Sequence, residues 1–93
     1  MYYFYVLYSL KDHKLYKGYS SDPAKRFLKH NAGGNSSTKN RRPLVLIHLE
    51  VFKSKSDALD RERWSKTPAG IYHLKDHLRN IGILDQDNRI LIE

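Results

Sequence analysis

Residues 1–19, MYYFYVLYSLKDHKLYKGY, decide the fold of this chain. From Tyr2 to Tyr8 the residues are apolar or aromatic at both odd and even positions, which is typical of a strand covered on both faces. The polar segment 11–14 predicts a turn, and residues 15–19 resume a β-prone run. The stretch therefore predicts a hairpin whose first strand lies in the centre of a sheet.

The rest of the chain predicts helices and one more strand. Ser21 or Asp22 can cap a helix with Pro23 in its first turn, and Gly33-Gly34 ends that helix. There follow, in order, a polar surface loop with nothing to bury over 33–42, a strand over 44–52, a helix from the Ser54 cap to Thr67-Pro68, and a last helix over about 72–81. The expected fold class is α+β: a three-stranded antiparallel sheet flanked by helices, in the order β-β-α-β-α-α.

Length and composition indicate one small domain with a polyanionic partner. The 93 residues form one domain over 1–81 and a tail over 82–93, which could add a short edge strand or dock on a partner. Lysine and arginine outnumber the acids 17 to 10, a formal charge of +7. Such charge favours phosphate contacts with a nucleic acid, although it could serve only solubility.

The absence of cysteine excludes disulfides and thiolate metal sites, and it fits a cytoplasmic location. The first ten residues lack the basic start and the cleavage site of a signal peptide, and they are too few to cross a bilayer. We therefore expect a soluble protein without a membrane partner. The sequence leaves the oligomeric state open, with a monomer favoured.

Two pairs of residues could bring hydroxyl groups together on the sheet. Strand side chains alternate, so Tyr3 and Tyr5 share one face of the first strand, and Tyr16 and Gly18 share one face of the second. Gly18 predicts a close backbone approach. Any single tyrosine could equally be core filler with its hydroxyl at the surface.

Charged side chains on the predicted helices supply further candidates. Arg26 and His30 are four residues apart, so both could reach one phosphate, or both could be solvated. Glu62 follows Ala58 by four residues, which places a carboxylate near the inward face. Such an acid needs a metal ion or a partner, and a salt bridge to Arg26 or Arg63 is the competing explanation.

Taken in order, these positions resemble the motif of the GIY-YIG endonucleases. Tyr3-Phe4-Tyr5 and Tyr16-Lys17-Gly18 match the two halves of the family name, and Arg26, His30-Asn31 and Glu62 follow at the family's spacing. The segment 57–62, DALDRE, is similar to the E-A-L-x-x-E stretch of small single-domain members, and 42–44 matches their entry into the third strand. Tyr3 replaces a glycine of the motif, and Lys17 replaces an apolar residue, which suggests a face that is partly wet or paired with an acid.

The resemblance implies a role for each position and a cofactor. Tyr5 would act as general base or orient the attacking water, and Tyr16 would contact the water or the phosphate. Arg26 would stabilise developing charge, and His30 would assist proton movement or hydrogen-bond a tyrosine hydroxyl. Glu62 would hold one divalent metal ion, Mg²⁺ or Mn²⁺, while Asn31 would support the local backbone and Gly18 the close approach. These groups suit phosphodiester hydrolysis.

The resemblance implies a metal-dependent endonuclease acting on nucleic acid, with DNA in repair or recombination expected, and two alternatives stay open. A catalytically weak or inactive nucleic-acid-binding module of the same fold would depend most on Lys39, Arg41 and Arg42 in the polar loop. A protein-interaction unit would instead use the apolar tail residues Ile90–Ile92.

Overall fold

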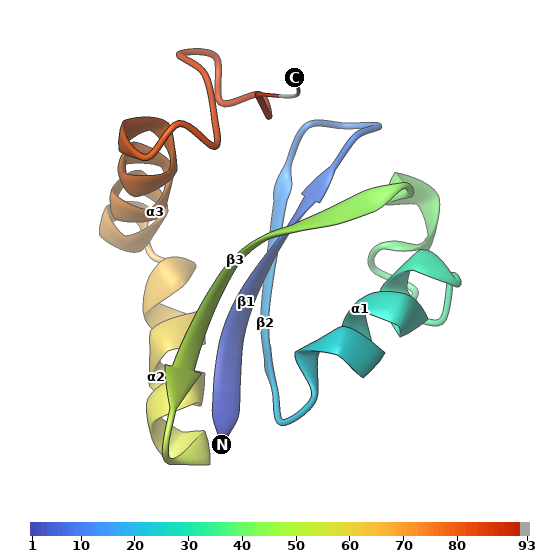
Figure 1. Cartoon of the computed structure of the whole chain (residues 1–93), viewed down its shortest axis with the longest axis vertical. Coiled ribbons are helices and arrows are strands. Elements are labelled where there is room, and N and C mark those ends of the chain that lie inside the picture. Colours follow the sequence, from blue (N-terminus) through green and yellow to red (C-terminus); the bar gives the residue numbers. More distant parts are fainter. Residues whose placement is uncertain (92–93) are drawn as a thin grey trace.

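The fold is a three-stranded antiparallel sheet with helices on both faces. The computed structural model describes residues 1–91. Along the chain the elements are β1 (Tyr2–Ser9), β2 (Leu15–Ser20), α1 (Pro23–Asn31), a 3₁₀ turn η1 (Lys39–Arg41), β3 (Leu44–Phe52), α2 (Lys55–Ser65) and α3 (Pro68–Asn80). Figure 1 shows α1 and η1 on one side of the sheet and α2 and α3 on the other. The α+β class and the predicted element order are confirmed.

Strand β1 is the central strand, as its apolar sequence predicted. The sheet order is β2-β1-β3, and both pairings are antiparallel. Phe4, Val6 and Tyr8 are fully buried on the face covered by α3, where they pack against Leu74 and Leu78. The opposite face of β1 supplies a second, smaller core around Tyr5, Leu7 and Leu44, which Phe27 of α1 helps to cover.

The pairing between β1 and β3 contains one bulge. Val6 lies opposite His48, and Leu7 lies opposite Leu46, so Ile47 has no partner on β1. Bulges insert one extra residue on one strand and increase the local twist. Leu46 therefore faces the smaller core with Leu7, whereas Ile47 packs against the larger one.

An ion pair joins β3 to α2 on the face of the sheet that carries the larger core. Arg61 donates to both carboxylate oxygens of Glu50, from Nε and Nη2 at 3.0 Å each, and His48 Nε2 lies 2.6 Å from Oε2. Burial by itself raises the pKa of Glu50, but hydrogen bonds from Arg61 and His48 outweigh it and hold the pKa below its usual value. The carboxylate is therefore ionised at neutral pH.

The helix boundaries differ from the prediction at one place. Thr67 caps α3 by accepting from the Gly70 amide at 3.1 Å, and Pro68 is the first residue of that helix rather than the end of the preceding one. The expected start at residue 72 was therefore wrong by one turn. Gly70 lies so close to the end of α2 that a Cβ there would meet the carbonyl carbon of Trp64 at 2.6 Å.

The residues after α3 turn back onto the larger core. Leu84 is 2% exposed and packs with Leu74 and Leu78. Ile90 forms an antiparallel bridge with Leu84, so this segment pairs with itself, and within residues 1–91 it adds no strand to the sheet. Ile90 also packs partly against the core, and Ile92 lies outside the described residues.

Candidate active site

One cavity brings together the five side chains singled out for catalysis. It has a volume of ≈ 440 Å³ and lies at the β2 edge of the sheet, where α1, the loop after it and α2 also reach. Its lining includes Tyr5 from β1, Tyr16 from β2, Arg26 and His30 from α1, and Glu62 from α2. Residues that are up to 57 positions apart in the sequence therefore face one space.

Gly18 determines where the ring of Tyr5 lies. The two residues are opposite each other in the β1–β2 ladder, and a Cβ at position 18 would be 2.6 Å from Cζ of Tyr5. Real Cβ atoms do not approach other atoms so closely, so only glycine leaves room for the phenol across β2. The close approach expected at Gly18 is made by this ring.

The hydroxyl of Tyr5 begins a buried chain of hydrogen bonds. It lies 3.2 Å from Nε2 of His30, and Nδ1 of His30 lies 2.7 Å from the hydroxyl oxygen of Thr38. Burial, together with the positive charges of Arg26 and Lys29, lowers the pKa of His30. The imidazole is therefore neutral at pH 7, and when Nδ1–H donates to Thr38, Nε2 can accept the Tyr5 proton.

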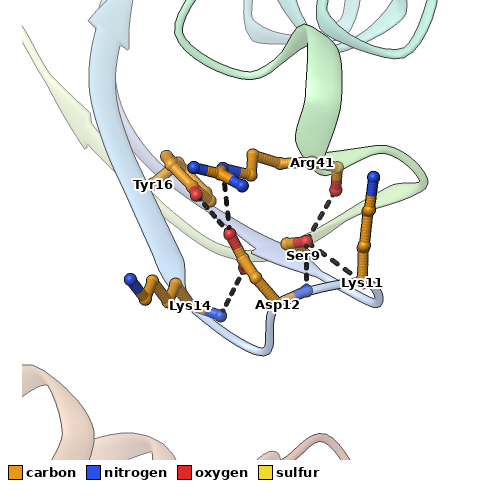
Figure 2. Close-up of polar contacts among 6 residues, drawn as sticks. All are labelled: Ser9, Lys11, Asp12, Lys14, Tyr16 and Arg41. Atoms are coloured by element: carbon orange, nitrogen blue, oxygen red, sulfur yellow. Dashed lines mark hydrogen bonds and ion pairs between the residues drawn. The ribbon is translucent and has the colours of Figure 1, made fainter.

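Tyr16 is held by an acid in the turn before β2 (Figure 2). Its hydroxyl donates to Oδ2 of Asp12 at 2.6 Å, and the guanidinium of Arg41 lies 3.3 Å from the same oxygen. Burial raises the pKa of Tyr16, and the hydrogen bond to Asp12 raises it further. Tyr16 therefore remains protonated, and its position depends on Asp12.

The turn and the polar loop are joined by Ser9. Its hydroxyl donates to the carbonyl oxygen of Arg41 at 2.6 Å and accepts from the amides of Lys11 and Asp12 at 3.1 Å each (Figure 2). Burial opposes ionisation of Asp12, but hydrogen bonds from Tyr16 and the Lys14 amide, together with the charge of Arg41, keep its pKa below the usual value. This corner of the site is thus fixed by contacts within the chain.

Glu62 reaches the cavity from α2 but is paired. Oε1 accepts from Nζ of Lys66 at 2.6 Å, one helical turn further on. The expected partners in a competing salt bridge, Arg26 and Arg63, were wrong. The Lys66 side chain is 55% exposed and the Glu62 side chain 15%, so the ammonium end of the pair lies at the surface. A stronger ligand for the carboxylate could displace the ammonium.

The donors in the cavity fit a hard divalent cation that binds mainly through water and substrate. Within residues 1–91, no three histidine, cysteine or acidic side chains gather as a preformed metal site. Mg²⁺ is commonly held by one or two carboxylates, several waters and substrate phosphates rather than by a full protein cage. Glu62 supplies such a carboxylate in a cavity that Tyr5 and Tyr16 also line.

A family model described as the GIY-YIG catalytic domain matches residues 1–70. The chain belongs to the GIY-YIG family. This family is one of nucleases, so the cavity is a candidate nuclease site. Membership also agrees with the sheet and helices described above, and it confirms the resemblance carried by Tyr3-Phe4-Tyr5 and Tyr16-Lys17-Gly18.

Several relatives of this GIY-YIG chain are named UPF0213 proteins. One from Staphylococcus saprophyticus is 48% identical over 66 residues, which cover 70% of this chain and 79% of the relative. One from Haloquadratum walsbyi is 39% identical over 67 residues, covering 71% and 75%, and one from Bacillus pumilus is 44% identical over 66 residues, covering 70% and 66%. No solved structure matches the chain significantly.

Among the described residues, every helix is too short or too polar to cross a bilayer.

The remaining predicted residues of this GIY-YIG chain lie outside the cavity lining. Asn31 exchanges hydrogen bonds with the backbone of Leu44, donating to its carbonyl at 3.0 Å and accepting from its amide at 2.9 Å, which joins α1 to β3. Arg41 is paired with Asp12, and Nε of Arg42 donates to the carbonyl of Lys39 at 2.9 Å. Arg41 and Arg42 of the polar loop are thus already engaged by groups of the same chain.

Two residues important for the site gave no local signal. Thr38 lies in the loop expected to bury nothing, yet it is 1% exposed because its hydroxyl meets His30, so that expectation was wrong. Asp12 had been assigned only to a turn. Lys17 is half-buried opposite Tyr16, as expected, but its close charged neighbours are Lys75 and Lys66 rather than an acid.

Proposed function

We propose that this chain is a metal-dependent endonuclease that hydrolyses phosphodiester bonds in nucleic acid, with DNA undergoing repair or recombination as its substrate. The observation that supports the proposal most is the convergence of Tyr5, Tyr16, Arg26, His30 and Glu62 on one cavity. A space of ≈ 440 Å³ admits a phosphate with parts of its two nucleotides. The cysteine-free composition suits work in the cytoplasm.

Tyr5 and His30 act together as the base. Neutral His30 accepts the hydroxyl proton of Tyr5 at Nε2 while Tyr5 takes a proton from the attacking water. The water oxygen forms a bond to phosphorus, and the bond from phosphorus to the leaving oxygen breaks. The leaving oxygen takes a proton from solvent, and His30 returns its proton to solvent. The lowered pKa of His30 keeps it able to accept a proton at neutral pH.

The other side chains bind and orient the phosphate. Arg26 offsets the negative charge that grows on the non-bridging oxygens, and Tyr16, fixed by Asp12, donates towards the same space when a substrate competes for its hydroxyl. Glu62 would hold Mg²⁺ or Mn²⁺. Such an ion supplies Lewis-acid stabilisation of the phosphoryl oxygens when bound.

The test is cleavage of labelled single-stranded, flapped and branched DNA in Mg²⁺ or Mn²⁺. We expect wild-type protein to nick at least one substrate, and Glu62→Gln and Tyr5→Phe each to lower the rate by about 10²–10³-fold while far-UV circular dichroism stays unchanged. Lys53→Met, at an exposed site after β3, is the control and should retain the wild-type rate. No cleavage of any substrate by wild-type protein would refute the proposal.

A catalytically inactive binding module is the second candidate, and the Glu62–Lys66 pair is the observation that favours it. In such a module the carboxylate is a structural partner of Lys66 rather than a metal ligand. Binding of DNA that falls steeply with salt, is unaffected by Glu62→Gln and is accompanied by no cleavage would support this function instead.

A further inference from the structure

We propose that one strand of the nucleic acid lies along the outer edge of β2, with Lys17 and Lys75 holding phosphates on one side of the cavity and Lys55 on the other. This inference rests on the proposed function and adds the path that a substrate strand follows across the protein. It assigns binding to residues outside the polar loop.

The path is a row of three hollows that share walls. The site cavity shares Leu15 and Lys17 with a neighbouring hollow of ≈ 300 Å³, which also contains Lys14 and Lys75. In the other direction it shares Tyr19 and Arg26 with a hollow of ≈ 360 Å³ that contains Lys55. The row follows β2, which has no neighbour on its outer side in the described sheet.

The length of this edge suits several phosphates. Six residues of β2 extend about 20 Å at roughly 3.3 Å per residue. A stacked nucleic-acid strand rises about 3.4 Å per nucleotide. A strand on this edge would therefore have phosphates next to the hollows on both sides while one phosphate occupies the cavity.

The charges along the row are positive and poorly compensated. Lys66 from α2 and Lys75 from α3 come close enough to Lys17 of β2 for their charges to act on it. Burial lowers the pKa of Lys17, and the charges of Lys75 and Lys66 lower it further. Of the described residues that line the central hollow, Glu62 alone is acidic, and its carboxylate is paired with Lys66. Converging like charges are relieved when an anion binds between them.

Two arginines of the polar loop already make contacts within the chain. Arg41 shares its charge with Asp12, which also accepts from Tyr16 (Figure 2). Arg42 donates to the carbonyl of Lys39. A phosphate must compete with these contacts, whereas no acid is bonded to Lys17 or Lys75 in residues 1–91.

The experiment measures binding without cleavage. Fluorescence anisotropy of a labelled flap DNA in EDTA gives the dissociation constant at several salt concentrations for wild-type protein and for Lys17→Met, Lys75→Met and Lys55→Met. We expect each variant to reduce the slope of log affinity against log salt by about 0.7–0.9, the amount for one lost phosphate contact. The matched control Lys53→Met should leave the slope unchanged.

A second measurement separates binding from folding. Because Lys17 is half-buried beside two other lysines, Lys17→Met should leave the melting temperature unchanged or raise it while weakening binding. If Lys17 had only a structural role, Lys17→Met would lower the melting temperature together with the DNA affinity.

The outcomes distinguish this inference from the proposed function. The path would be overturned if Lys17→Met and Lys75→Met bind DNA as strongly as wild-type protein, or if binding is lost mainly in Lys39→Met. Either result would count even if the protein cleaves DNA. Reduced slopes in the three variants would support the path even if wild-type protein shows no cleavage. Absence of binding by wild-type protein would overturn the path and leave cleavage to be judged by its own assay.

Discussion

Replacing Gly18 with alanine tests whether the phenol of Tyr5 needs the space above β2. The new Cβ would lie 2.6 Å from Cζ and 3.0 Å from Cε2 of Tyr5, a residue of the central strand that is 5% exposed. Overpacking of this kind costs about 1–3 kcal/mol, and alanine recovers about 0.5–1 kcal/mol by restricting the unfolded chain. We expect a net loss of about 1–2 kcal/mol, or about 4–16 °C in Tm for a domain of this size.

Urea denaturation of a double-mutant cycle identifies the cause of that loss. In a Tyr5→Leu background the ring atoms nearest the new methyl group are absent, so only the gain of about 0.5–1 kcal/mol from restricting the unfolded chain should remain for Gly18→Ala. The coupling energy between the two positions should then equal the overpacking cost of about 1–3 kcal/mol. If Gly18→Ala lowers the free energy of unfolding equally in both backgrounds, the backbone rather than the ring requires glycine, and the reasoning is refuted.

Three further changes have definite expected results. Thr38→Val leaves Nδ1 of buried His30 without its partner and should lower the free energy of unfolding by about 1–3 kcal/mol in urea; an unchanged value would contradict the buried chain. The folded state lowers the pKa of Glu50, so its ionised carboxylate stabilises the fold at pH values above its unfolded pKa of about 4.3. This stabilisation is lost as the pH falls through the folded pKa, so acidification should lower Tm less in Glu50→Gln than in wild type. Gly70→Ala pushes a Cβ into the backbone of Trp64 and should cost about 3 kcal/mol, and a wild-type Tm would show that the helix junction can yield.

The strands and the sheet order could be predicted from sequence because each depends on local pattern. The two-sided apolar run of β1 requires cover on both faces, and that requirement alone places it between β2 and β3. The start of α3 was misplaced because Pro68 was interpreted as a stop. Proline ends one helix and begins the next equally well, and the cap at Thr67 distinguishes the two.

The site was predictable to the extent that its residues carry a family pattern. Spacing brought Tyr5, Arg26 and Glu62 under consideration, and they line one cavity. The contacts of Thr38 and Asp12 depend on how the loop and the turn fold back in space. A polar segment has no hydrophobic periodicity from which that path could be predicted. The same applies to the pairing of Glu62 with Lys66, because several basic side chains lay within reach of the acid.

The unpartnered residue in β3 determines which length changes this strand can accept. Removing Ile47 would bring Leu46 and His48 next to each other, opposite Leu7 and Val6, and every side chain on either side would keep its present face. Removing His48 instead would have the same result, because Ile47 also faces the larger core and could take its place opposite Val6. Removing an internal residue away from this bulge would send part of the strand to the wrong face, because orientation alternates with each step. The bulge is thus the place where β3 could lose a residue while Leu44 and Leu46 keep packing in the smaller core.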